Sequence, residues 1–164
     1  MTLRGLDDLD RRILHALQRD ARGVSSRDVA DDVGVSPSTV RKRIARLERT
    51  GVLVGSHAVV DYERAGYPLH VQITCTAPIR VRETASEAAV AVPGVVGVRE
   101  LSTGERNVFV TVVGRDGDDL TRVASALDEC GLVVVDEKLV RSDRSQPFDG
   151  FDPGSPRDPD RTPV

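Results

Sequence analysis

Five basic side chains crowd into nine residues near the end of the first third of the chain: Arg41, Lys42, Arg43, Arg46 and Arg49. The one acid within that stretch is Glu48, so five bases less one acid leave a net charge of +4. Guanidinium and ammonium groups donate hydrogen bonds to phosphates and to the acceptor edges of bases. This pattern favours recognition of a polyanion over bond-making chemistry.

Three helices are expected to position these groups within a first domain at residues 1–56. Apolar residues at helical spacing predict a helix over 7–22. Ser25 and Asp28 fit a capping box that opens a second, short helix, and Gly34 provides a tight turn after it. Ser36 as N-cap with Pro37 at the first helical position opens a third helix that runs to about residue 50.

The last two helices, joined by a glycine-containing turn, predict a helix-turn-helix. Its second helix would enter the major groove, with hydroxyl and basic side chains near its start facing base edges and later ones facing phosphates. The N-terminus of the preceding helix, which Ser25 caps, could also hold a phosphate. The predicted DNA-binding residues are Ser25, Arg27, Ser36, Ser38, Thr39, Arg41, Lys42, Arg46 and Arg49. The alternative for such a helix is a merely solvated basic face.

Charge is distributed unevenly along the chain, which supports DNA binding over a merely solvated basic face. Residues 1–56 hold 11 basic and 8 acidic side chains, a net +3, whereas residues 57–164 hold 12 and 18, a net −6. An anionic partner therefore fits the first domain and not the rest. Two short runs after it, 52–55 and 57–61, predict strands of a wing or hairpin, and residues 57–67 form a hairpin and hinge linker.

A second domain is predicted at 68–141, with strands and helices in ferredoxin-like βαββαβ order. The expected strands are 69–76, 95–101, 107–114 and 132–140, and the expected helices are 80–92 and 119–129. Helices would cover one face of this sheet, and the aliphatic strands predict that the other pairs with a second copy in a homodimer. The fold class is therefore α+β, with a winged-helix-like helix-turn-helix before the ferredoxin-like domain.

The tail at 142–164 holds five of the nine prolines and no periodicity, so it is predicted to be disordered. Phe148 and Phe151 could pin it to a subunit surface, and an unanchored tail is the equal alternative. Cys75 and Cys130 lie far apart and are expected to be buried free thiols. We expect no metal site, cofactor or catalytic residue, and the lack of a long apolar run or signal peptide predicts a cytoplasmic protein.

Three segments of the first domain resemble the Lrp/AsnC family of leucine-responsive and feast/famine regulators, including its archaeal members. They are LDDLDRRIL at 6–14, VGVSPSTVRKRI at 33–44 and LERTGVL at 47–53. The resemblance runs to about residue 140. It implies a winged or hairpin-linked helix-turn-helix, a ligand-sensing domain, effectors that are often amino acids, and dimers that can assemble further, to octamers for instance.

The family's loop between the second and third strands tends to read Thr-Gly-x-x-Asp and helps bind the effector. Here Asn107 replaces the acid, and an amide holds a ligand ammonium more weakly than a carboxylate does. The effector is then an amino acid or another small molecule, or the loop binds none. The residues that the resemblance implies for this site are Thr103, Gly104, Glu105 and Asn107.

Together these observations predict a sequence-specific DNA-binding transcription regulator that is not an enzyme. Two alternatives remain open. One is a protein that organises DNA with little sequence preference, which would show a salt-dependent affinity but a low specificity ratio. The other is a metabolite-binding module without a role on DNA.

Overall fold

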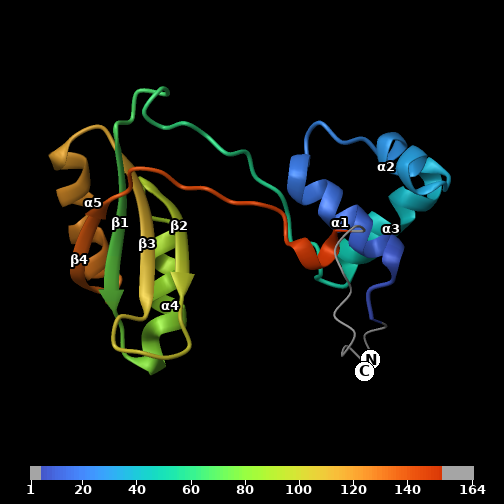
Figure 1. The fold of residues 1–164 in the computed structure, drawn as a ribbon. Coiled ribbons are helices and arrows are strands. Elements are labelled where there is room, and N and C mark those ends of the chain that lie inside the picture. The colour runs from blue at the N-terminus through green and yellow to red at the C-terminus, as the bar shows by residue number, and fades with distance from the viewer. Residues whose placement is uncertain (1–4, 153–164) are drawn as a thin grey trace. The chain divides into compact units, whose positions relative to one another are not determined.

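The computed structural model describes residues 5–152, and its first unit is built from three helices (Figure 1). They are α1 (Asp8–Asp20), α2 (Ser26–Val33) and α3 (Pro37–Arg49). The side chains of Ser25 and Ser36 cap α2 and α3 as the sequence predicts, and Gly34 ends α2 with a positive φ of 70°. The buried core between the helices is small and aliphatic: Ile13, Leu14, Val29, Ala30, Val40 and Leu47.

No strand forms among the described residues between α3 and residue 69, so the predicted wing strands at 52–55 and 57–61 are wrong. Val54 and Val59 are 92% and 91% exposed, and neither packs against another element. An isolated two-stranded hairpin is marginal in water because it buries no apolar face, which explains the failure. Residues 62–66 form a turn, in which the Ala65 N–H donates to the Asp61 carbonyl at 3.1 Å.

The second unit is a four-stranded antiparallel sheet with both of its helices on one face (Figure 1). The strands are β1 (Leu69–Thr76), β2 (Val95–Glu100), β3 (Val108–Gly114) and β4 (Val133–Leu139), in the order β2-β3-β1-β4. The helices are α4 (Ile79–Val90) and α5 (Gly117–Glu129). This arrangement confirms the predicted ferredoxin-like domain and the α+β class.

Alternation along the strands separates an aliphatic face from a more polar one. Val71, Ile73 and Cys75 of β1 lie in the core beneath the helices, together with the valines of β3. His70 and Gln72 lie on the opposite, open face, where Gln72 is paired in register with Thr111. The aliphatic residues are used mainly on the helix side, so the open face is less apolar than the sequence suggested.

The end of the described chain belongs with the first unit, not the second. The chain divides into one unit that runs to Ala58 and resumes at Arg144, and another from Val59 to Asp143. A short 3₁₀ helix, η1 (Asp149–Phe151), lies against α1, and the Phe148 N–H donates to Gln18 Oε1 at 3.1 Å. Phe151 packs on the small helical core and stacks edge-on with Phe148.

The tail therefore differs from the disorder predicted for it as far as residue 152. Of the two alternatives for the phenylalanines, the pinned one is the arrangement that the structure shows. Apolar contact with the helical core offsets the entropy of ordering this segment, which the proline count alone could not reveal. The expectation for residues 153–164 lies outside the described residues.

Both cysteines of the chain lie in the sheet unit as free thiols. Cys75 is fully buried and Cys130 half-buried, and both are free; burial, with a smaller effect of the Glu137 charge, raises the pKa of Cys75 to about 11. Within residues 5–152 no group of three His, Cys, Asp or Glu side chains is arranged to hold a metal ion. No helix there is both long and apolar enough to span a membrane.

Candidate nucleic-acid interface

The N-terminus of α3 presents three hydroxyl groups in one small cluster. Ser36 Oγ accepts from the Thr39 N–H at 3.2 Å and lies 2.9 Å from both Ser38 Oγ and Thr39 Oγ1. Ser36 and Ser38 are exposed, whereas Thr39 is half-buried. Rotatable hydroxyls at a helix N-terminus can both donate and accept, so this end of α3 suits contact with base edges or a phosphate.

Three of the five basic residues on α3 are free to meet an external anion. Arg41, Lys42 and Arg49 are exposed, and within the described chain none of them forms an ion pair or a side-chain hydrogen bond. Val40 and Leu47 anchor the opposite side of the helix in the core. The exposed side of α3 therefore carries three of the four bases that the sequence predicts to face DNA.

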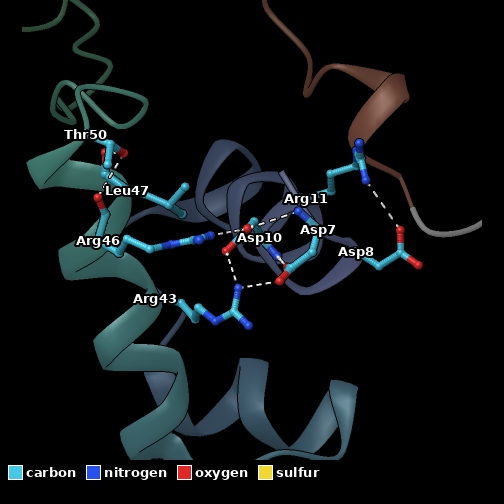
Figure 2. Close-up of polar contacts among 8 residues, drawn as sticks. All are labelled: Asp7, Asp8, Asp10, Arg11, Arg43, Arg46, Leu47 and Thr50. Carbon is cyan, nitrogen blue, oxygen red and sulfur yellow. Dashed lines mark hydrogen bonds and ion pairs between the residues drawn. The ribbon is translucent and has the colours of Figure 1, made fainter. Parts of the chain in front are cut away.

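The other two bases of α3 are used inside the protein. Arg43 and Arg46 reach across to α1, as Figure 2 shows, and both bind the carboxylate of Asp10. Arg43 lies 3.2 Å from Asp10 Oδ1 and also binds Asp7, while Arg46 binds Asp10 Oδ2. Asp10 itself is fully buried. These four residues, which we call the α1–α3 ionic seam, fix one helix against the other.

The prediction that Arg46 faces DNA phosphates does not match this placement. Only 31% of its side chain is exposed, and its guanidinium is paired with a buried carboxylate. Releasing it would break one of the two ion pairs that compensate the buried charge of Asp10 and would leave that carboxylate with Arg43 alone. The geometry makes Arg46 a positioning residue for α3.

Asp7 and Asp10 also cap the first helix, so the ionic seam is tied to the start of α1. Asp7 Oδ1 accepts from the Asp10 N–H at 2.9 Å, and Asp10 Oδ2 accepts from the Asp7 N–H at 3.1 Å. Partial burial raises the pKa of Asp7, but the hydrogen bond from the Asp10 backbone and the Arg43 guanidinium outweigh it and hold that pKa below its usual value. Asp7 is therefore ionised in the folded protein at neutral pH.

The start of α2 is less suited to a phosphate than the sequence indicated. Ser25 is an exposed residue whose hydroxyl lies 2.6 Å from Asp28 Oδ2 and accepts from the Arg27 and Asp28 N–H groups at 3.2 Å. Hydrogen bonds from the Ser25 hydroxyl and backbone hold the pKa of Asp28 below its usual value. A carboxylate already fills this N-terminus, so Arg27, which is exposed, is the better anion ligand of the two.

The loop predicted to bind an effector divides into an exposed part and a buried one. Thr103, Gly104 and Glu105 are exposed, whereas Asn107 is 5% exposed. Asn107 Oδ1 accepts from the Ala77 N–H at 3.0 Å, and its Nδ2 donates to the Ala77 carbonyl at 2.9 Å. The amide thus holds the loop to the end of β1 instead of facing a ligand. An aspartate carboxylate has no N–H and could not donate the hydrogen bond to the Ala77 carbonyl.

Sequence reasoning missed the ionic seam, which joins two helices that lie far apart in the sequence. A signal was nonetheless present. Asp7 and Asp10 are three residues apart on one predicted helix, and Arg43 and Arg46 are three apart on another. Residues at that spacing lie on one helix face, so the two aspartates could form ion pairs with the two arginines if the two helices packed together.

Comparisons with known proteins agree with this geometry. Residues 6–54 match the family model described as winged helix-turn-helix DNA-binding. An HTH-type transcriptional regulator of Pyrococcus abyssi is 37% identical over 118 residues, which are 71% of this chain and 73% of that one. The regulator LrpA of Pyrococcus horikoshii is 32% identical over 122 residues, 73% of this chain and 84% of its own.

Solved structures share the fold of both units. AsnC of E. coli superposes with a TM-score of 0.66 at 23% identity, over 88% of this chain and 98% of AsnC. A transcriptional regulator of Neisseria meningitidis, solved as an L-Met complex, gives a TM-score of 0.67 at 22% identity, over 88% of this chain and 96% of its own. With the curated relatives, these findings establish that the chain belongs to the Lrp/AsnC family of sequence-specific, DNA-binding transcription regulators.

Proposed function

We propose that α3 is the recognition helix, with Ser36, Ser38, Thr39, Arg41 and Lys42 at base edges and Arg49 and Arg27 on phosphates. The observation that carries this assignment is the contrast within α3 itself. Arg41, Lys42 and Arg49 are exposed and unpaired within the described chain, whereas Arg43 and Arg46 are bound to α1. Three free bases therefore remain to neutralise DNA phosphates or read bases.

The salt dependence of DNA binding tests this count. Each phosphate contact contributes a slope of about −0.9 to the plot of log K against log salt concentration. We expect Arg49→Ala to make the slope shallower by about 1 for each DNA-bound copy. Arg80→Ala is the matched control, because Arg80 is an exposed arginine of α4 and should leave the slope unchanged. An unaltered slope for Arg49→Ala contradicts the assignment.

Specificity is tested separately, with a DNA fragment selected from a random pool and a scrambled fragment of equal length. A side chain that reads bases is worth about 1–3 kcal/mol of discrimination. Arg41→Ala and Lys42→Ala should therefore weaken binding to the selected fragment by more than they weaken binding to the scrambled one. Equal losses on both fragments would instead indicate the protein that organises DNA with little sequence preference.

We propose further that the working species is a homodimer, because two copies would place two recognition helices on a two-fold DNA site. Exposed apolar side chains support an interface between copies. On the edge strand β4, Val133 is 58% exposed and Leu139 is 67% exposed, and Val54 and Val59 are almost fully exposed. Sedimentation of the full chain should give a dimer mass or a multiple such as an octamer; a monomer at micromolar concentration contradicts the proposal.

An amino-acid effector is the third part of the proposal, supported by the Neisseria meningitidis regulator that was solved as an L-Met complex. In this chain the exposed loop residues Thr103, Gly104 and Glu105 would contact it, while Asn107 stays on Ala77. Calorimetric titration with L-Met tests this, with Glu105→Ala as the variant. Heat of binding that Glu105→Ala leaves unchanged would remove the loop from the site.

A further inference from the structure

Two stretches of chain join the helical unit to the sheet unit, one before the sheet unit in the sequence and one after it. Residues 54–60 form the first stretch and residues 141–147 the second, so each is seven residues long. Within the described chain, neither stretch forms a hydrogen bond or an ion pair. The freedom of the helical unit therefore depends on where the ends of these two stretches are fixed.

On the sheet unit, both stretches are fixed beside the start of β1. The turn that follows the first stretch places the Tyr62 ring 5.7 Å from the His70 ring, measured between ring centres. After that turn, the Arg115 guanidinium donates to the Tyr67 hydroxyl at 3.2 Å. The second stretch starts after Val140, whose N–H donates to the His70 carbonyl at 2.7 Å. The two stretches thus leave the sheet unit from neighbouring points.

On the helical unit, the two stretches are fixed to different helices. The first begins after Leu53, whose N–H donates to the Leu47 carbonyl of α3 at 3.1 Å. The second ends at Phe148, whose N–H donates to Gln18 Oε1 of α1 at 3.1 Å, and Phe151 then packs on the helical core. We call residues 148–151 the clasp.

The clasp is a compact element that packs on itself as well as on α1. The rings of Phe148 and Phe151 meet edge to face, with their centres 5.1 Å apart. Gly150 lies against the Phe148 ring, because an added Cβ would lie 2.5 Å and 2.6 Å from two of its carbons. Edge-to-face pairs of this kind stabilise a fixed geometry. A side chain at position 150 would therefore displace the ring and weaken the clasp.

A second attachment changes what the helical unit can do. A unit held by one flexible linker can rotate about it, whereas a unit held at two separate points cannot rotate freely about either. The second stretch is also short: the eight steps from Val140 to Phe148 span at most about 29 Å when fully extended. Closing this ring of chain costs conformational entropy, which the contacts of the clasp offset.

We propose that the clasp limits rotation of the helical unit about the linker, and that in a homodimer this restraint narrows the spacing between half-sites that the protein accepts. The second part rests on the dimer of the proposed function. The clasp lies against α1, whereas the three free bases lie on α3, so it acts through orientation and not through contact with DNA. Phe148, Gly150 and Phe151 are then positioning residues.

Three variants separate restraint from stability. In the equal-length variant, residues 142–146 are replaced by five Gly and Ser residues, which keeps the net charge because one acid and one base are lost together. The lengthened variant adds ten more Gly and Ser residues at the same place and leaves the clasp intact. Gly150→Ala weakens the clasp while keeping both phenyl rings. The equal-length variant is the matched control for the lengthened one.

Relaxation of the ¹⁵N amide signals of the full chain tests the restraint without DNA. In the wild type and the equal-length variant, we expect α1 to α3 to tumble with the same correlation time as the sheet. In the lengthened variant and in Gly150→Ala, the helices should tumble faster than the sheet. Helices that already tumble faster in the wild type, or that lengthening leaves unchanged, overturn the proposal.

Half-site spacing tests the consequence for DNA binding. The fragments carry two copies of a selected half-site, separated by whole helical turns or by an added half turn of about 5 bp. The wild type and the equal-length variant should bind the best whole-turn fragment at least about tenfold more tightly than its half-turn counterpart, because only one phase lets both helical units engage. The lengthened variant should lose most of this preference and keep its affinity for a single half-site.

Two results on DNA would overturn the proposal. One is a spacing preference that survives in the lengthened variant although its helices tumble independently. The other is an equal loss of affinity at every spacing in Gly150→Ala with no change in the lengthened variant, since the clasp would then only stabilise the helical core. A wild type that sediments as a monomer contradicts the dimer alone, and the relaxation result then decides whether the clasp restrains the helical unit.

Discussion

A buried aspartate in the helical unit and a buried asparagine in the sheet unit have nearly the same shape, yet the two are held in opposite ways. Asp10 in the helical unit is fully buried and is bound by the guanidinium groups of Arg43 and Arg46. Asn107 in the sheet unit is 5% exposed and exchanges two hydrogen bonds with the Ala77 peptide. One is a charged contact between helices, and the other a neutral one between a loop and a strand.

The difference follows from how much apolar core each unit has. Among the described residues, the core of the helical unit contains 6 buried side chains, while that of the sheet unit contains 13. A small core specifies the angle between two helices weakly, so directional ion pairs add specificity. A larger aliphatic core fixes its own packing, and Asn107 beside it is neutral and has both its amide oxygen and its amide nitrogen hydrogen-bonded.

Replacing each of these side chains by the other type tests this comparison. The larger loss of stability is expected for Asp10→Asn. The change keeps the shape of the side chain but removes the negative charge that pairs with two guanidinium groups. We therefore expect the free energy of unfolding of the helical unit to fall by about 3 kcal/mol. Amide hydrogen exchange of α1 and α3 reports this loss. Asp8→Asn is the control, because the exposed pair of Asp8 with Arg11 should contribute below about 1 kcal/mol. Equal losses in both variants would refute the role given to the ionic seam.

Asn107→Asp is the reverse exchange, with an expected loss of about 2 kcal/mol in the sheet unit. The carboxylate has no hydrogen to donate to the Ala77 carbonyl, and the charge would be buried without a cation. Exchange of the β1 and β3 amides measures the effect. Glu105→Gln, an exposed change in the same loop, should alter stability by less than about 0.5 kcal/mol. A stable Asn107→Asp protein would mean that the position accepts a charge, as a ligand-facing site would.

The smallest expected effect is a loss of stability of the helical unit at low pH. The pKa of Asp7 is held below its usual 3.8 in the folded state, so its contribution is present above that value and is lost as the pH falls through the lower folded value. The helical unit should therefore weaken below about pH 4, by less than about 1 kcal/mol from this half-exposed group. Asp7→Asn should flatten that fall in unfolding experiments between pH 5 and 2. An identical fall in the variant would assign it to other carboxylates.

Local patterns predicted the helices and the strands of the sheet well, since caps at Ser25 and Ser36 and strand alternation depend on near neighbours. Contacts between distant segments were the part that failed. Arg46 and Asp10 are 36 residues apart, and only the packing of α3 on α1 decides that they meet. The same holds for Asn107, whose partner Ala77 is 30 residues away. A wing was predicted from β propensity alone, which gives no strand without a pairing partner.

The seat of Phe151 on the helical core has a consequence for synthesis. A ribosome makes α1 to α3 first, yet one side chain of that layer emerges about a hundred residues later, after the whole sheet unit. Packing of the helical unit can therefore be completed only after the C-terminal segment has been synthesised. Any fragment cut at the linker would contain α1 to α3 and still lack a side chain that packs on their core.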